Sequence, residues 1–156
     1  MQLLNELRMF QIDLGAACGK PVLARSLGDR VPGKNPDSRG SIAIAADGRV
    51  YSSVRVDNET KFGTGYLHHL TRFDPRTTPI ADLGVIAVKN PDFFDFKGPQ
   101  AKNPDDSLRP RHGFHTLPDG TLTPLHVIMS TIVARDGTIY ATSIYPFTLL
   151  RIPAVP

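Results

Sequence analysis

Apolar and polar positions alternate over short stretches of this chain, and helical spacing is hard to find. Between residues 41 and 56, isoleucines alternate with alanines before an Asp47-Gly48 pair, and a second β-prone run follows it. Alternation with a period of two is typical of half-buried strands. Asp-Gly predicts a tight two-residue hairpin, because such a turn requires positive φ. Fourteen prolines and thirteen glycines divide the rest of the chain. The pattern predicts an all-β protein with many short strands.

A second segment, residues 130–145, repeats the first one. The two align without a gap at an offset of 89, the separation of Asp47 and Asp136. The identical pairs are Ser41 with Ser130, Ala45 with Ala134, Asp47 with Asp136, Gly48 with Gly137, and Tyr51 with Tyr140. An internal repeat in this register indicates a modular β architecture. Tyr51 and Tyr140 are expected to pack between neighbouring modules.

A second element is also repeated. Residues 70–75 (LTRFDP) resemble residues 9–14 (MFQIDL), and residues 149–153 (LLRIP) are a weaker third copy. The first two copies are followed by a turn and a strand that ends in Leu-Gly, at 27–28 and 83–84. Together with the hairpin, this order predicts a four-stranded antiparallel meander as the repeating unit.

These motifs carry a family resemblance. The runs DGRVY, LTRFDP and IADLG, and later DGTIY and LLRI, are similar to blades of β-propellers of the streptogramin-lyase, gluconolactonase-like and NHL-type superfamily. The resemblance covers residues 10–84 and 129–153. It implies four-stranded antiparallel blades around a central channel. Propellers have about four to eight blades of about 40 residues, so this chain is expected to supply about three blades of an incomplete ring.

The resemblance also gives a map of the chain. Residues 1–156 are expected to form a single β-propeller fragment: 8–29 the end of one blade, 41–88 a complete blade, 89–125 an insertion or degenerate blade, and 126–156 a partial blade. Both ends break within a blade. The missing blades are therefore expected from a longer chain, and self-association is the alternative. The off-pattern segment contains an Asp119-Gly120 pair that predicts another hairpin, and long insertions often carry function.

Candidate binding residues come from a repeated loop motif. Lys-Asn-Pro-Asp occurs at 34–37, 89–92 and 102–105. The resemblance places the first two between blades, on the face of loop 57–61, where propeller ligands usually bind. The ligand-binding candidates are Lys34, Asn35, Asp37, Asp57, Asn58, Asp92 and Asp105. Their oxygens could bind a divalent cation, Ca²⁺ or Mg²⁺, although Asn-Pro-Asp is also ordinary turn chemistry. No other cofactor is indicated.

The histidines offer a second set of candidates. His112 and His115 lie in the off-pattern segment and could take part in acid–base or metal chemistry. On an extended strand, however, residues three apart point to opposite faces, and the neighbours His68 and His69 diverge in the same way. No zinc-enzyme motif such as H-E-x-x-H occurs. Packed or surface histidines are the competing interpretation.

Composition narrows the classes of protein. The chain has 156 residues, 40% of them hydrophobic and 21% charged, which is typical of a globular domain. The net charge of +3 comes from scattered basic residues, so no nucleic-acid partner is predicted. The single cysteine, Cys18, excludes an intramolecular disulfide. No apolar run could span a membrane, and residues 1–14 do not resemble a signal peptide, so a cytoplasmic location is expected if Met1 is the genuine start.

Two functions of different classes follow from the sequence. The repeat alone predicts a binding or scaffold module that forms part of a longer propeller protein, with a small-molecule or protein ligand that is not specified. The alternative, which the resemblance implies, is a lactonase-like hydrolase or a lyase that uses a divalent metal. The chain lacks a recognisable form of the Glu, Asn and Asp metal pattern of lactonase-like members, and of the paired histidines of the lyases. Fold analogy by itself does not establish activity.

Overall fold

The computed structural model describes residues 8–12, 19, 24–29, 36–37, 42–59, 65–87, 114–124, 128–143 and 148–156. Every regular element in these ranges is a β-strand, and every strand pairing is antiparallel. The all-β, antiparallel prediction is therefore confirmed. In the same ranges there is no helix with the length and apolar character needed to cross a bilayer.

The strands form small sheets. They are β1 (Arg8–Ile12), β2 (Ala24–Asp29), β3 (Ile42–Ile44), β4 (Val50–Asp57), β5 (Tyr66–Asp74), β6 (Thr77–Val85), β7 (Phe114–Thr116), β8 (Leu122–Pro124), β9 (Ile128–Val133), β10 (Ile139–Ser143) and β11 (Thr148–Ile152). The central sheet has four strands in the order β3-β4-β5-β6, which is a simple meander. Beside it are a three-stranded sheet, β11-β10-β9, and the pairs β1-β2 and β7-β8.

The central sheet and the β9–β11 sheet have the same register. Tyr51 pairs with Arg72 in the central sheet, and Tyr140 pairs with Arg151 in the other. Across the Asp-Gly hairpins, Ile44 pairs with Val50 just as Val133 pairs with Ile139. The sequence repeat is therefore also a repeat of strand pairing, with β3, β4 and β5 equivalent to β9, β10 and β11.

The β1–β2 sheet repeats the second half of the central sheet, including its irregularity. Gly28 in β2 and Gly84 in β6 have φ of +94° and +96°, and the strand register shifts beside each of them. The N–H of Gly28 donates to Ser26 Oγ at 3.3 Å, and the N–H of Gly84 donates to Asp82 Oδ1 at 2.9 Å. Glycine is suited to such a bulge because it adopts positive φ without steric cost. The Leu-Gly motif thus marks a β-bulge within the strand.

The three Asp-Gly hairpins are built alike, but not as two-residue turns. In each hairpin the N–H of the residue before the turn donates to the carbonyl four residues on, which encloses three residues, and the glycine N–H donates back to the carbonyl of that first residue. The first residues are Ala45, Leu117 and Ala134. The glycines have positive φ, between +82° and +86°. This is a type I turn followed by a glycine bulge. The hairpins are confirmed at all three sites and the predicted two-residue turn is wrong, because the strands close one residue farther from the Asp-Gly pair. Each aspartate accepts the N–H two residues on.

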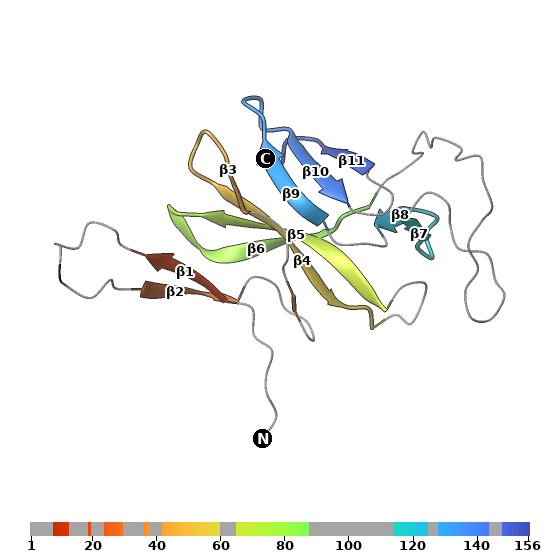
Figure 1. Cartoon of the computed structure of the whole chain (residues 1–156), viewed down its shortest axis with the longest axis horizontal. Helices are drawn as coiled ribbons and strands as arrows, with labels where there is room; N and C mark the ends of the chain where they lie inside the picture. Colours follow the sequence, from red (N-terminus) through yellow and green to blue (C-terminus); the bar gives the residue numbers. More distant parts are fainter. Residues whose placement is uncertain are drawn as a thin grey trace, which may run out of the picture.

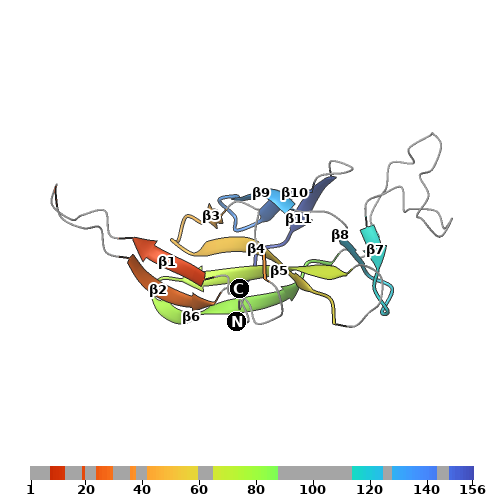
Figure 2. The ribbon, with the colours of Figure 1, turned by 60° about the horizontal axis from the view of Figure 1, so that its bottom comes forward.

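The sheets lie against one another in a stack. The central sheet lies between the β9–β11 sheet and the β1–β2 sheet (Figure 1), and β3 and β4 approach β9 while β2 approaches β6. In a view turned by 60° the β9–β11 sheet again lies above the central sheet, and the β1–β2 sheet overlaps the left end of the central sheet beside β6 (Figure 2). The largest buried core lies between the central and β9–β11 sheets: Tyr51, Leu70, Ile86, Phe114, Ile128, Ile139, Ala141 and Leu150. Among the described strands these sheets do not close into a ring.

Alternation along the strands decides which side chains enter that core. Ile139 and Ala141 of β10 face the central sheet, so Tyr140 between them points away from it. The expectation of packing between sheets is confirmed for Tyr51 and wrong for Tyr140, which is only partly buried. The β7–β8 hairpin joins the same core through Phe114, and Thr123 Oγ1 donates to the carbonyl of Ile86 at 3.0 Å.

Candidate functional site

A polar cluster lies at the end of the central sheet where β4 turns into β5. Arg55 pairs with His68 across the two strands, and Asp57 pairs with Tyr66. Because side chains alternate along a strand, these four residues project from the same face of the sheet. This is the face that packs on the β9–β11 sheet farther along the strands.

Arg55 is at the centre of the cluster. Its backbone N–H donates to the carbonyl of Asp37 at 2.7 Å, and the N–H of Asp37 donates to the carbonyl of Arg55 at 2.8 Å. The Arg55 Nη2 atom is also 2.8 Å from Asp37 Oδ2 in an ion pair whose side chains are about one-third exposed. Asp37 is therefore attached to the edge of β4 by both backbone and side chain.

An aromatic ring also contacts the Arg55 guanidinium. The Arg55 Cζ atom lies 4.7 Å from the centroid of the Tyr66 ring, which is within the range of cation–π attraction. Tyr66 meets His68 edge to face, with ring centroids 5.7 Å apart. His68 is almost completely buried. The cluster thus joins a guanidinium, a carboxylate, a phenol and an imidazole, groups that could recognise a polar ligand by hydrogen bonds and ring contacts.

Three of the ligand-binding candidates meet at this end of the sheet. Asp37 contacts Arg55, Asp57 is the last residue of β4, and the buried Asn58 follows it. Lys34, Asn35, Asp92, Asp105 and His112 lie outside the described residues. His115 is a backbone member of β7, and its side chain is also outside the described part. Arg55, Tyr66 and His68 were missed by sequence reasoning, since arginine and aromatic residues in an alternating strand look like ordinary strand positions.

A divalent-cation site is not seen in the described residues. Within these ranges no group of three or more His, Cys, Asp or Glu side chains is placed to hold a metal ion. Asp37 faces a guanidinium, which competes with a cation for its carboxylate. The carboxylate of Asp37 is therefore paired with Arg55 in this structure.

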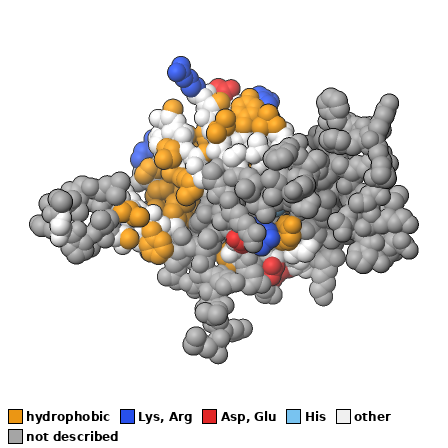
Figure 3. Space-filling view, in the orientation of Figure 1, with side chains coloured by type: hydrophobic (Ala, Val, Ile, Leu, Met, Phe, Trp, Pro, Cys, Tyr) orange, Lys and Arg blue, Asp and Glu red, His pale blue; other side chains and the backbone are white. Residues whose placement is uncertain are grey.

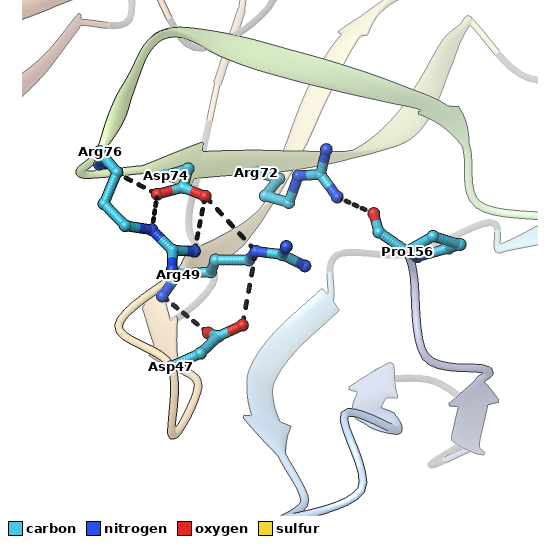
Figure 4. A network of polar contacts seen from close by, with 6 residues as sticks. All are labelled: Asp47, Arg49, Arg72, Asp74, Arg76 and Pro156. Atoms are coloured by element: carbon cyan, nitrogen blue, oxygen red, sulfur yellow. Dashed lines mark hydrogen bonds and ion pairs between the residues drawn. The ribbon is translucent and has the colours of Figure 1, made fainter.

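The opposite end of the central sheet holds a second polar network (Figure 4). Asp74 accepts hydrogen bonds from the backbone N–H and the Nε and Nη2 atoms of Arg76, each at 2.9 Å. Arg49 Nε lies 3.5 Å from Asp74 and 3.4 Å from Asp47, and Arg72 donates to the carbonyl of Pro156. The side-chain and backbone hydrogen bonds from Arg76 hold the pKa of Asp74 well below its ordinary value. The network ties the β3–β4 turn to the β5–β6 turn, so we assign it to folding.

The neighbouring histidines of β5 are divided between the two faces, as predicted from strand alternation. His68 belongs to the polar cluster, whereas His69 Nδ1 lies 2.9 Å from Asp82 Oδ2 on the other face. Asp82 also accepts the N–H of Gly84 at the bulge of β6. The His69–Asp82 pair therefore stabilises the bulge, and it is not part of the polar cluster.

Comparisons with known proteins complete the description of the site. A scan of protein-family models, a search of curated proteins and a search of solved structures found no match to this chain.

Proposed function

We propose that this chain is a β-propeller-type repeat module that serves as a binding or scaffold unit. The observation that supports the proposal is the repeated strand register. The central sheet shares its pairing and its Asp-Gly turn with the β9–β11 sheet, and its glycine bulge with the β1–β2 sheet. Sheets that repeat in sequence and pack face to face form rigid arrays, whose loops and strand ends are available for recognition.

The polar cluster around Arg55 is the binding end of this module. It lies at a strand end and combines a charged group held in place by Asp37 with an aromatic ring. Because the Arg55 side chain is already fixed by its contacts with Asp37 and Tyr66, it loses little side-chain entropy when a ligand binds. The ligand-binding candidates Asp37, Asp57 and Asn58 lie at the same end.

A scaffold requires its sheets to unfold as one unit, and an interface substitution tests this. Leu150 is buried in the core between the two sheets. Leu150→Ala is expected to lower the free energy of unfolding by about 2–5 kcal/mol in a single urea transition, because it leaves a cavity. Leu149→Ala, one residue away on the exposed side of β11, is the control. Two separate transitions, with only one of them shifted, would contradict a single scaffold unit.

The metal-dependent lactonase or lyase is the competing function, and no observation in the described residues favours it. The whole chain is tested with Ca²⁺, Mg²⁺, Mn²⁺ and Zn²⁺ for a rise in melting temperature, since an ion bound only by the folded state stabilises it. Hydrolysis of glucono-1,5-lactone is assayed with and without each ion. A binding module should show neither effect, and ion-dependent turnover would replace the scaffold proposal with the enzyme.

A further inference from the structure

The large exposed apolar side chains of this molecule lie on particular faces of the stacked sheets. Among the described residues they are Phe10, Ile12, Ile42, Ile44, Ile132 and Leu149. Scattered apolar residues are normal on a protein surface, but apolar groups gathered on a sheet face indicate an interaction surface. In Figure 3 hydrophobic side chains gather at the left, from the β1–β2 sheet to the adjoining end of the central sheet, and at the top over the β9–β11 sheet.

The first of these faces belongs to the β9–β11 sheet. Register makes Leu149 equivalent to Leu70 and Ile132 equivalent to Ala43. Leu70 is 5% exposed, because its face is covered by the β9–β11 sheet, whereas Leu149 is 66% exposed. We call the surface formed by Ile132, Tyr140, Thr142 and Leu149 the open β9–β11 face. It repeats a face that is buried elsewhere in the same molecule.

The second face is the opposite side of β1. Register makes Phe10 and Ile12 equivalent to Leu150 and Ile152 of β11. Leu150 is buried in the core and Ile152 packs against it, whereas Phe10 and Ile12 are 54% and 56% exposed. We call the surface formed by Phe10 and Ile12 the open β1 face. It is equivalent to the β11 face that packs on the Leu70 side of the central sheet.

The other apolar side chains of these strands show the same relation between burial and contact with a neighbouring sheet. Met9, on the side of β1 equivalent to Leu70, is buried, as expected of a face that meets the next sheet. Ile42 and Ile44 of β3 are equivalent to Thr131 and Val133 of β9. In β9 this side lies against the central sheet, whereas in β3 both isoleucines are exposed. The exposed apolar groups thus mark places where the repeating sheet-on-sheet contact is not made.

We propose that these two open faces bind one another between two copies of this chain, head to tail. The open β9–β11 face of one copy packs on the open β1 face of the next, as the Leu70 side of the central sheet packs on the Leu150 side of the β9–β11 sheet. A second copy is the occupant because the chain presents both halves of an interface that it already forms internally. Such a contact joins different surfaces of identical subunits, so it produces a ring or a filament.

The test uses two variants that each remove one face. Leu149→Asp places a charge on the open β9–β11 face, and Phe10→Asp places one on the open β1 face. Light scattering after gel filtration is expected to show the unmodified chain at twice its 17.1 kDa mass or more at tens of micromolar, and each variant alone at the single-chain mass. An equimolar mixture of the variants should give a two-chain species, since one intact face of each kind remains.

The mixture distinguishes head-to-tail binding from other modes of association. A mixture that stays monomeric, while both variants keep the circular dichroism spectrum and melting temperature of the unmodified chain, would overturn the proposal. So would an unmodified chain that remains a monomer at the highest concentration, which is the outcome expected if another protein or another part of a longer chain covers these faces. Arg135→Asp, in the exposed β9–β10 turn, is the matched control and should associate like the unmodified chain. If Leu149→Asp loses the folded spectrum, Leu149→Lys replaces it.

Discussion

The central sheet and the β9–β11 sheet have the same strand register and differ in what surrounds them. Tyr51 and Leu70 have identical residues at the equivalent positions, Tyr140 and Leu149. In the central sheet both residues are buried, whereas Leu149 is largely exposed. A residue type and its place in a strand therefore do not determine burial. The position of the sheet in the stack determines burial, because among the described sheets only the central one has a neighbouring sheet on each side (Figure 1).

The leucine pair should show the largest difference between the two sheets. Leu70→Ala is expected to lower the free energy of unfolding by about 2–5 kcal/mol, because it leaves a cavity in the core. Leu149→Ala should change it by less than about 1 kcal/mol, as surface substitutions do. Urea denaturation is measured at concentrations where the chain is monomeric. Equal losses would show that the open β9–β11 face is covered within one chain.

A smaller difference is expected from the hydroxyl pairs. In the central sheet Ser52 Oγ and Thr71 Oγ1 are 2.7 Å apart and buried, whereas Ser130 Oγ and Thr142 Oγ1, 2.6 Å apart, are exposed. Thr71→Val leaves the Ser52 hydroxyl without this partner and should cost about 1–3 kcal/mol of unfolding free energy. Thr142→Val should cost less than about 0.5 kcal/mol, because water replaces the lost partner.

A compensating substitution checks the physical cause. Ala141 and Leu150 occupy the positions of Ser52 and Thr71 in the β9–β11 sheet, so an apolar pair is compatible with this backbone. Adding Ser52→Ala to Thr71→Val removes the second hydroxyl and should recover most of the loss in urea denaturation. A double variant no more stable than Thr71→Val would mean that the lost hydrogen bond from Thr71 Oγ1 to the Ser52 carbonyl, and not the unpaired Ser52 hydroxyl, caused the loss.

The turn glycines give a third comparison. Gly48 and Gly137 have φ of +86° and +84°, so alanine is strained at both positions by about 1–2 kcal/mol. A Cβ at Gly137 would also lie 3.1 Å from the Cβ of Ala154, whereas a Cβ at Gly48 would lie 4.0 Å from Pro75 Cγ. Thermal denaturation should therefore show a larger loss of stability for Gly137→Ala than for Gly48→Ala. Equal losses would mean that the segment after β11 moves away from the new Cβ without a cost in stability.

The smallest expected effect is the pH dependence from Asp74. Its pKa is lower in the folded chain than the ordinary value of about 3.9, first because Arg76 donates hydrogen bonds to it. The stabilisation is therefore complete above pH of about 4 and is lost as the pH falls toward the folded pKa. Asp74→Asn should make the melting temperature fall less steeply as the pH is lowered below about 4. Asp136→Asn is the matched variant in the β9–β10 turn, where the Thr138 N–H lowers the pKa of the aspartate in the same direction.

Part of the fold could be predicted from short-range patterns. The Asp-Gly pairs predicted the hairpins at residues 47, 119 and 136, and the repeat of 89 residues predicted that Tyr51 and Tyr140 occupy equivalent strand positions. The turn type was predicted wrongly, because the same dipeptide fits a two-residue loop or the end of a three-residue one. The choice depends on which residues the flanking strands pair, and a dipeptide does not specify that pairing.

The candidate site was predictable only in part, for a similar reason. Asp37 and Asp57 were identified because polar residues in turn motifs stand out in a sequence. Arg55 and Tyr66 were not, since their partnership depends on a β4–β5 register in which Asp57 pairs with Tyr66. The loop segment around Asp37 reaches Arg55 through an isolated bridge, far from any local pattern.

The sequence by itself determined the local features of this protein: strands, three Asp-Gly hairpins, and a unit that repeats with the same register. These depend on backbone sterics and on side-chain alternation, which act over a few residues. Only the tertiary structure decided that Leu70 is buried and Leu149 is exposed, and that Arg55 lies between Asp37 and Tyr66. Alternation states that a side chain lies on a face of a sheet, whereas burial depends on what packs against that face.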